Sequence, residues 1–383
     1  MASSCGLKKE KPLFELMEKT GIDFVNQVDD GKKENSFLFR NFYNGGGVAI
    51  GDINNDGLPD VFLTSNAGAN KLYLNKGNFQ FEDISKKAGI IVDDIWNTGV
   101  VMADINADGW LDIYVCSSGH MPTGNRKNKL YINNHNGTFT ESAAAYGLDI
   151  KAYTTQVSFF DYDMDGDLDC FMINNSPIPV NQLEFSNKRD LLESKWPVGD
   201  FLKGGGDHLF RNDNGHFVEV TQDAGIHGTL LSFGMGVSVG DINNDGYPDV
   251  YVANDSYERD YLYINQKNGK FKDVLEEKMQ HTSFSSMGAD IADVNNDGYS
   301  DIFTTDMLPL SDFRIKTTGA FDDIDMFNRK IGAGFYYHYV KNCLQLNSPS
   351  GNFKDIGNFS GVSASDWSWG ALMFDMDLSL IHI

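Results

Sequence analysis

The chain has 383 residues, of which 41% are hydrophobic, and it carries 39 glycines, 9 prolines and a formal net charge of −23. The hydrophobic fraction supports a buried core, and the acidity excludes nucleic acid as a partner, because the sequence has no basic stripe to displace counterions from phosphates. The same charge disfavours docking on an anionic membrane surface, and the sequence has no run of 18 apolar residues that could span a bilayer.

Residues 1–10 are polar and are expected to form a flexible tail. The Ala-Ser-Ser-Cys stretch that ends at Cys5 resembles the cleavage region of a bacterial lipoprotein, in which this cysteine would carry a lipid anchor. The charged and apolar segments that normally precede such a cysteine are missing, so an ordinary cysteine in a tail is the alternative. Cys116 and Cys170 lie at or just after apolar strand starts and are expected to be buried free thiols.

A nine-residue acidic pattern occurs five times and defines the organisation of the chain. The copies begin at Asp52, Asp104, Asp161, Asp241 and Asp293, with spacings of 52, 57, 80 and 52 residues. Each copy has Asp or Asn at positions 1, 3, 5 and 9 and glycine at position 6. Such self-similarity is typical of a repeat architecture.

The segments that flank each acidic loop have the pattern of short β-strands. A small, apolar segment precedes the loop, as at residues 47–51, and an apolar segment follows it, as at residues 61–64. A third strand has the pattern of residues 70–75, and after a glycine turn a fourth begins with Phe, as at residues 79–83; an Ala-Gly-Ile stop often closes the unit. Four strands in about 50 residues predict one blade of a β-propeller. Because one blade cannot bury both its faces, the blades must stack in a ring.

The predicted fold is therefore all-β, a β-propeller of four-stranded blades over residues 11–377, with the acidic loops between the first and second strands. Residues 13–22 have the pattern of a fourth strand with its stop, and we expect them to close the ring by joining the final blade. Residues 378–383 abandon the motif and are interpreted as a truncated or non-native tail. Blades are expected at about 44–90, 96–148, 153–226, 233–280 and 286–362, with a partial sixth at 367–377.

Two units are longer than the others. The third carries an insertion at residues 175–206 and the fifth one at residues 307–339. Both are expected to project from a rim as loops or short helices, either with a function of their own or as surface decoration.

The acidic loops are predicted to bind Ca²⁺, about five ions in all. Hard oxygen donors at positions 1, 3, 5 and 9 are spaced to converge on one point, and glycine at position 6 allows the sharp turn. Position 7 varies freely, as expected if only its backbone carbonyl is a ligand, and the loops contain none of the His or Cys that zinc prefers. The predicted ligands are Asp52, Asn54, Asp56, Leu58 and Asp60; Asp104, Asn106, Asp108, Trp110 and Asp112; Asp161, Asp163, Asp165, Asp167 and Asp169; Asp241, Asn243, Asp245, Tyr247 and Asp249; and Asp293, Asn295, Asp297, Tyr299 and Asp301.

Two other interpretations of the loops fit the sequence less well. An EF-hand needs Glu at position 12, which is here occupied by Leu63, Val115, Met172, Val252 and Thr304. Ordinary Asp-Gly turns capped by their own side chains are the other alternative, and five copies with the same donor spacing argue against it. Because calcium is scarce in the cytosol, loops of modest affinity indicate a location outside the cell.

The chain resembles a known family in these motifs. Phe-Gly at residues 233–234, followed by Gly-Val-Ser-Val-Gly-Asp at 236–241 and the acidic loop, is similar to the FG-GAP (or VCBS) repeat that builds the calcium-binding propeller of integrin α-subunits. Residues 43–52 and 70–75 extend the similarity to bacterial cell-surface proteins related to cartilage acidic protein. The resemblance covers residues 11–377 and implies a full ring of seven blades, in which calcium has a structural role. The third loop departs from the pattern by having Asp163 where the others have Asn, which should strengthen cation binding.

The resemblance implies a non-catalytic module, extracellular or at the cell surface, for adhesion or for binding a glycan or protein ligand. A calcium-dependent polysaccharide lyase is the second hypothesis, with His120, His208, His338 or Lys203 as candidates for the base and the substrate-neutralising cation, although none lies in a recognisable motif. A purely structural spacer is the third.

Overall fold

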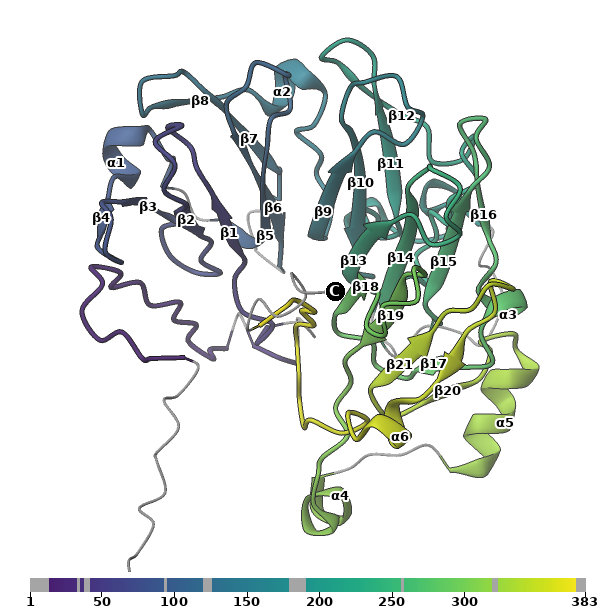
Figure 1. The fold of residues 1–383 in the computed structure, drawn as a ribbon. Helices are drawn as coiled ribbons and strands as arrows, with labels where there is room; N and C mark the ends of the chain where they lie inside the picture. Colours follow the sequence, from purple (N-terminus) through teal and green to yellow (C-terminus); the bar gives the residue numbers. More distant parts are fainter. Residues whose placement is uncertain are drawn as a thin grey trace, which may run out of the picture.

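The computed structural model describes residues 14–32, 35–37, 42–92, 95–119, 126–178, 191–255, 258–318 and 323–376. Within these residues it contains five four-stranded antiparallel sheets, each formed by strands in sequence order (Figure 1). The strands are β1 (Val48–Gly51), β2 (Asp60–Leu63), β3 (Lys71–Asn75) and β4 (Phe81–Asp83); β5 (Trp96–Ala103), β6 (Asp112–Ser118), β7 (Lys129–Asn133) and β8 (Phe139–Glu141); β9 (Thr154–Phe160), β10 (Asp169–Asn174), β11 (His208–Asn212) and β12 (Phe217–Glu219); β13 (Gly234–Gly240), β14 (Asp249–Asn254), β15 (Tyr261–Asn265) and β16 (Phe271–Asp273); and β18 (Ala289–Ala292), β19 (Asp301–Thr304), β21 (Cys343–Leu346) and β22 (Lys354–Asp355).

The sheets are arranged around an axis by their first strands. β1 contacts β5, β5 contacts β9, β9 contacts β13, and β13 contacts β18. In Figure 1 these strands lie toward the middle of the molecule, and the fourth strands β4, β8, β12 and β16 lie toward its outside. The fold is therefore a β-propeller, which confirms the prediction from the repeat.

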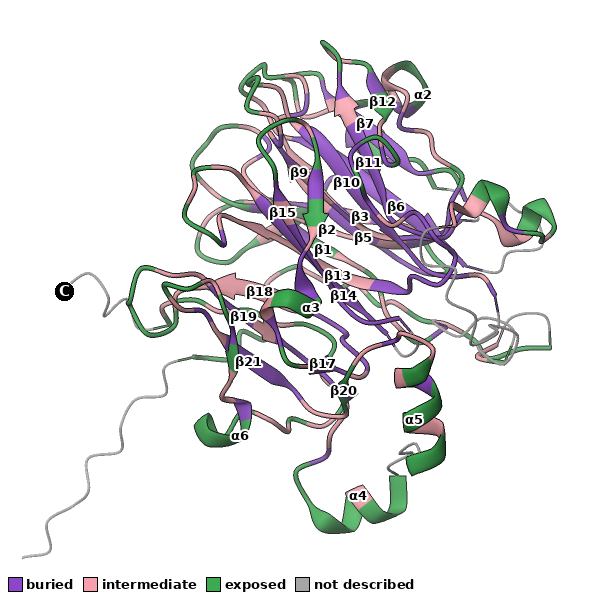
Figure 2. Cartoon of the chain, turned by 90° about the vertical axis from the view of Figure 1, so that its right-hand side faces the viewer, coloured by how far each residue is buried: buried purple, intermediate pink, exposed green. Residues whose placement is uncertain are grey.

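The hydrophobic core lies between neighbouring blades. Phe62 and Leu72 of the first blade, for example, share a cluster of buried residues with Val115 and Tyr131 of the second. Equivalent clusters join each later pair of blades. The second strands are covered on both faces, and β6, β10 and β14 are buried along their whole length (Figure 2). Each blade is thus stabilised by its neighbours, as expected for a repeat that cannot bury its faces alone.

The two cysteines expected to be buried are free thiols, as predicted. Cys116 in β6 and Cys170 in β10 are fully buried in the cluster between the second and third blades. They act there as small hydrophobic side chains.

A short helix follows the fourth strand in four blades, where the sequence predicted only a stop. These helices are α1 (Ser85–Ala88), α2 (Ala143–Tyr146), α3 (Leu275–Lys278) and α6 (Gly357–Ser360). Three of them end at a glycine with a positive φ, such as Gly89 at 83°. At the equivalent point of the third blade, Gly225 (φ 79°) touches the next blade, because a β-carbon placed on it would lie 2.8 Å from the carbonyl oxygen of Phe271.

The strand expected at residues 13–22 is not formed. Leu13 lies outside the described residues, and residues 14–22 have an irregular backbone. The Thr20 carbonyl accepts a hydrogen bond from the Phe81 N–H (2.7 Å), and Gly21 has φ 85°. The Ala224 carbonyl makes the same contact with Phe271 between the third and fourth blades. This part of the N-terminal segment therefore occupies the place of a stop before the first blade.

The two insertions contain short helices in their described parts. The first has η2 (Glu193–Lys195) and η3 (Asp200–Leu202). The second has α4 (Asp312–Thr318) and α5 (Ile324–Gly332), which project from the sheets and are largely exposed (Figure 2). The second insertion returns through β20 (His338–Tyr339), which pairs in parallel with β17 (Thr282–Ser283).

The segment predicted to begin a sixth blade lies beside the first strand of the fifth. A β-carbon on Gly288 would lie 2.9 Å from the carbonyl oxygen of Trp369, and the Met373 N–H donates to the carboxylate of Asp290. In the described part of the chain, every helix is too short or too polar to cross a membrane.

Candidate metal-binding loops

All five acidic loops connect the first strand of a blade to the second. In each pair, the residue before the loop is the Cα partner of position 9, as Gly51 is of Asp60 in the first blade. The same register holds in the other four blades. The five loops therefore lie at the same end of their blades, as the sequence predicted.

The aspartate at position 9 is buried and fixed by the backbone. In the first loop, Asp60 accepts a hydrogen bond from the Ile53 N–H at Oδ2 (3.0 Å) and one from the Asn75 N–H at Oδ1 (2.7 Å). The other four loops repeat both bonds. Burial raises the pKa of Asp112 to about 6 and that of Asp169 and Asp249 to about 7. A nearby cation would therefore favour the charged form of these groups.

The first half of each loop folds over the carboxylate at position 1. In the first loop, Asp52 accepts hydrogen bonds from the N–H groups of Asp56 (3.2 Å) and Gly57 (2.7 Å). The turn needs left-handed backbone at Asn55 (φ 57°) and Gly57 (φ 84°), and glycine adopts that conformation without strain. The N–H of position 7 donates to the carboxylate of position 5 in every loop, a contact that does not involve the position 7 side chain.

Four loops place an amide hydrogen bond between two of the predicted ligands. The Asn54 Nδ2 donates to Oδ2 of Asp56 (3.0 Å), and the asparagine at position 3 makes the same bond in the second, fourth and fifth loops. Each amide thus satisfies one acceptor of its own loop by a hydrogen bond. Coordination of a cation by both side chains would require this bond to break.

The third loop lacks this bond because Asp163 has no N–H₂ group to donate. Asp161, Asp163 and Asp169 each place a carboxylate oxygen within 4.8 Å of the others. Oδ1 of Asp163 is buried, and no described residue donates a hydrogen bond to it. Burial raises the pKa of Asp163, and the charges of Asp165 and Asp161 raise it further. An oxygen without a donor among converging carboxylates fits a hard divalent cation.

A histidine and a lysine lie against the acidic loops. The sequence patterns did not predict these contacts. The His135 Nε2 is 2.9 Å from Oδ2 of Asp108, and the Lys267 Nζ is 3.4 Å from Oδ2 of Asp245. Both residues stand two positions after the asparagine that ends the third strand, in the turn toward the fourth. Alignment of the repeats on that asparagine would have identified them.

The candidates for a lyase site lie on separate elements. His208 in β11 pairs with Glu219 (2.8 Å), and Lys203 pairs with Asp200 (3.1 Å). His338 in β20 is buried with its ring against that of Phe284 (4.9 Å between centroids). His120 lies outside the described residues. Each described candidate therefore contacts a different neighbour.

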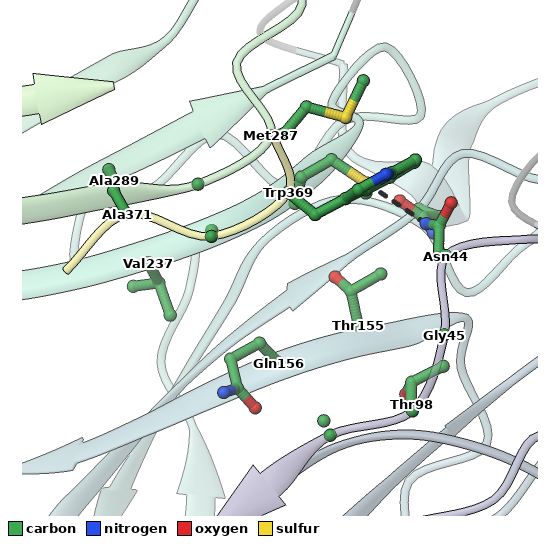
Figure 3. Close-up of a pocket in the computed structure, with 18 residues that line it drawn as sticks. Asn44, Gly45, Thr98, Thr155, Gln156, Val237, Met287, Ala289, Trp369 and Ala371 are labelled. Carbon is green, nitrogen blue, oxygen red and sulfur yellow. Dashed lines mark hydrogen bonds between the residues drawn. The ribbon is translucent and has the colours of Figure 1, made fainter. Parts of the chain in front are cut away.

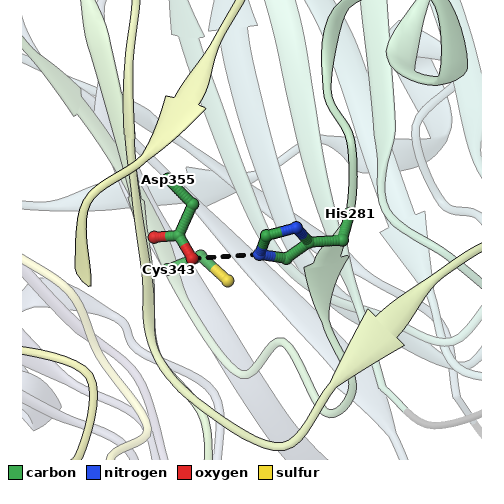
Figure 4. Close-up of side chains that lie close together, drawn as sticks. All are labelled: His281, Cys343 and Asp355. Carbon is green, nitrogen blue, oxygen red and sulfur yellow. Dashed lines mark hydrogen bonds and ion pairs between the residues drawn. The ribbon is translucent and has the colours of Figure 1, made fainter. Parts of the chain in front are cut away.

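A second cluster of ligand-type side chains lies between the fourth and fifth blades (Figure 4). His281, Cys343 and Asp355 have ligand atoms within 4.8 Å of one another. The carboxylate of Asp355 is, however, already paired with the His281 Nε2 (2.9 Å) and with the Lys341 ammonium. Burial acts to raise the pKa of Asp355, but these hydrogen bonds outweigh burial and hold it well below its usual range. We interpret the cluster as an ion pair that joins two blades.

The architecture and the repeated loops define a β-propeller with an acidic loop in each blade, and the family follows from a direct match. The model of the FG-GAP-like repeat matches residues 26–115, 118–172, 198–252 and 241–304, which together are more than half of the chain. The chain belongs to this family of FG-GAP-like repeats.

Similar proteins match parts of the chain. Cartilage acidic protein 1 from Xenopus tropicalis is 32% identical over 137 residues, which are 35% of this chain and 20% of that protein. Human integrin alpha-6 is 36% identical over 148 residues, 36% of this chain and 11% of the integrin. A solved Agrocybe aegerita lectin that recognises non-reducing terminal N-acetylglucosamine has a TM-score of 0.40 at 17% identity, covering 82% of this chain and 67% of the lectin chain, and this similarity is too low to carry an argument. The chain spans only a small part of the length of these two curated relatives.

Proposed function

We propose that the chain is a calcium-stabilised, non-catalytic module that binds a glycan or protein ligand outside the cell or at its surface. The observation that carries the calcium part is the third loop, in which three carboxylates converge and Oδ1 of Asp163 is buried without a donor in the part of the chain that the structure describes. The ion in each loop would be held by the side chains at positions 1, 3, 5 and 9 and the carbonyl of position 7. When bound, calcium would neutralise these carboxylates and link the first strand to the second.

The location rests on the relatives and on the loops. Similarity to an integrin α-subunit and to a protein of cartilage supports a place outside the cell. Loops of modest affinity would be filled there and not in the cytosol. A lipid anchor at Cys5 is part of this proposal, and that residue lies outside the described part of the chain.

A melting experiment in the presence and absence of calcium tests the proposal. Calcium should raise the melting temperature over that in a chelator, because a ligand at about 100 times its dissociation constant adds about 2.7 kcal/mol per site. Magnesium at the same concentration is the control and should have a smaller effect, since it prefers tighter octahedral sites with several waters. Equal melting temperatures in millimolar calcium and in chelator would overturn the calcium part.

A polysaccharide lyase is the second candidate function, and the separate partners of His208, Lys203 and His338 weigh against it. Incubation with a polyuronate and calcium distinguishes the two. The appearance of unsaturated products would establish the enzyme and contradict the binding module. A spacer without a ligand predicts calcium stabilisation together with no binding to a glycan array.

A further inference from the structure

A cavity of about 390 Å³ lies on the axis of the propeller, surrounded by the inner strands. In every unit it is lined by the residue five positions before the first aspartate of the acidic loop. That residue is Gln156 in the third blade, and in the other units it is a glycine: Gly47, Gly99, Gly236, Gly288 and Gly370.

At Gly47, Gly99 and Gly288 glycine is required because the neighbouring backbone comes very close. A β-carbon on Gly47 would lie 2.7 Å from the carbonyl oxygen of Thr98, and one on Gly99 would lie 2.5 Å from that of Thr155. Real β-carbons do not approach backbone atoms so closely. At the glycine positions the inner strands therefore carry no side chain toward the axis, and Gln156 is the exception among these six residues.

The residue just before each of these positions also lines the cavity, and its chemistry varies. These residues are Gly46, Thr98, Thr155, Met235, Met287 and Trp369. Figure 3 shows the indole of Trp369 beside Met287, with Thr155, Gln156 and Thr98 on the other side of the space. The Asn44 Nδ2 reaches the sulfur of Met235 (3.7 Å), which is the dashed line in the same view. This variable layer, rather than the glycines, determines what the cavity accepts.

The lining combines an aromatic face with uncharged amides. Trp369 is 38% exposed, and the amide groups come from Asn44, Gln156 and Asn175. Asn175 is only 2% exposed, yet among the described residues neither its Nδ2 nor its Oδ1 has a hydrogen-bond partner. A buried amide without partners is costly, so a ligand that offers both a donor and an acceptor would be stabilised there. None of the described residues that line the cavity is charged.

We propose that this axial cavity binds a neutral sugar ring. The indole of Trp369 would pack against the C–H face of the ring, and the Asn175 amide would exchange hydrogen bonds with its hydroxyls. An acidic sugar would meet no cation among the described lining residues and would approach a chain of net charge −23. A purely apolar ligand would leave Asn175 unsatisfied. The volume lies at the small end of the range of about 300–1,000 Å³ typical of small-molecule sites.

The proposal rests on the proposed function and deepens it, since it names a site and a ligand class for the binding module. The cavity is five residues along the inner strand from the acidic loops, roughly 17 Å at about 3.3 Å per residue. Calcium would therefore not touch the sugar. Calcium stabilisation and sugar binding can for this reason be measured separately, and one can fail without the other.

The test measures binding of the methyl glycosides of glucose, galactose and mannose to the calcium-saturated chain, by saturation-transfer NMR and calorimetry, with glucuronate as the charged comparison. At least one neutral glycoside should bind, and glucuronate should bind more weakly. Trp369→Ala should weaken that binding tenfold or more. Trp367→Ala is the matched control, because Trp367 is 63% exposed, lies two residues away and is not part of the lining; it should leave the affinity unchanged.

Asn175→Leu provides a second variant that keeps the side-chain size and removes the amide, and it should also weaken binding at least tenfold. Melting curves in calcium establish that each variant is folded. The proposal is overturned if none of the neutral glycosides binds, if the two tryptophan variants bind alike, or if glucuronate binds as well as the neutral sugars. A chain that melts higher in calcium but binds no glycoside would lose this inference and keep the calcium part of the proposed function.

Discussion

At the scale of single residues, the five loops are similar but not equivalent. The asparagine at position 3 donates an amide hydrogen bond within its own loop, and in the third loop Asp163 replaces it with a second acceptor. That change adds one negative charge and removes a competing bond at the same point. The third loop should for both reasons have the highest affinity for calcium.

The reciprocal exchange of these two residues tests this difference. Asp163→Asn should lower the affinity of one site about tenfold, or about 1.4 kcal/mol, because it restores the amide bond and removes a charge. Asn106→Asp should raise the affinity of the second loop by the same reasoning. Calorimetric titration with calcium against a competing chelator measures both changes. Unchanged isotherms for both variants would contradict the ranking of the loops.

At the scale of elements, the junction between blades depends on a glycine in the left-handed region. Gly225 (φ 79°) lies against the Phe271 carbonyl of the next blade. Gly269 has nearly the same φ of 76°, but a β-carbon added to it would have no neighbouring atom within 4 Å. Both glycines therefore need a left-handed backbone, but only Gly225 lies close to the backbone of a neighbouring blade.

Substitution of each glycine by alanine separates the two effects. Gly269→Ala should cost about 1–2 kcal/mol in the free energy of unfolding, for the left-handed backbone alone. Gly225→Ala should cost at least about 1–3 kcal/mol more, because the methyl group would displace the neighbouring blade. Urea unfolding curves measure both. Equal losses would show that the contact with Phe271 contributes nothing.

A buried ion-pair network also joins the third and fourth blades. Asp273 in β16 accepts a hydrogen bond from Arg259 (2.8 Å) and is 3.3 Å from the His227 Nε2. Burial acts to raise the pKa of Asp273, but His227 and Arg259 outweigh it and lower the pKa to about 2. The carboxylate is therefore more acidic in the folded chain than in the unfolded one.

The sign of this shift gives a pH dependence. Because the pKa of Asp273 is lower in the folded chain, its carboxylate stabilises the fold at any pH above the unfolded pKa of about 3.9. This stabilisation is lost as the pH falls through about 4 toward 2. Asp273→Asn should therefore reduce the free energy of unfolding by about 2 kcal/mol at neutral pH. The gap between wild type and variant should close by about pH 2. A gap that stays constant between pH 6 and pH 2 would assign the effect to packing instead of charge.

The sequence predicted those features that each repeat carries within itself. Strands such as β3 and β7, the acidic loops between first and second strands, and the order of the blades all follow from local patterns. The contacts of His135 and Lys267 with the loops, the irregular backbone at residues 14–22 and the axial cavity depend on how separate segments meet in space. A pattern of residue types in one chain does not contain that information.

At the scale of the whole molecule, the buried clusters of each blade are shared with the blades next to it in sequence. Phe353, which precedes β22, is 4% exposed and packs with Leu262 and Leu275 of the fourth blade. Its N–H also donates to the Lys278 carbonyl (2.9 Å). In such an architecture, a defect at one interface should affect mainly the two blades that share it.

Hydrogen exchange read by mass spectrometry tests this locality. Phe353→Ala should cost about 3–5 kcal/mol at its interface and speed exchange in the fifth blade, with little change in β5–β8. Phe139→Ala, at the interface of the first and second blades, is the matched control and should show the opposite distribution. Uniformly faster exchange across all blades in both variants would indicate one global unfolding unit.

The glycine that five of the six units place at the axis has a consequence for how such a chain could change its specificity. Because glycine contributes no side chain, the width of the axial space depends on how many units surround it. Gain or loss of a repeat would change the width of the cavity in one step. Substitution of Gln156, or of lining residues such as Thr98 and Trp369, would then change which groups of a ligand the lining can contact. Duplication of a repeat would thus change the width of the axial cavity, and point substitution would change the chemistry of its lining.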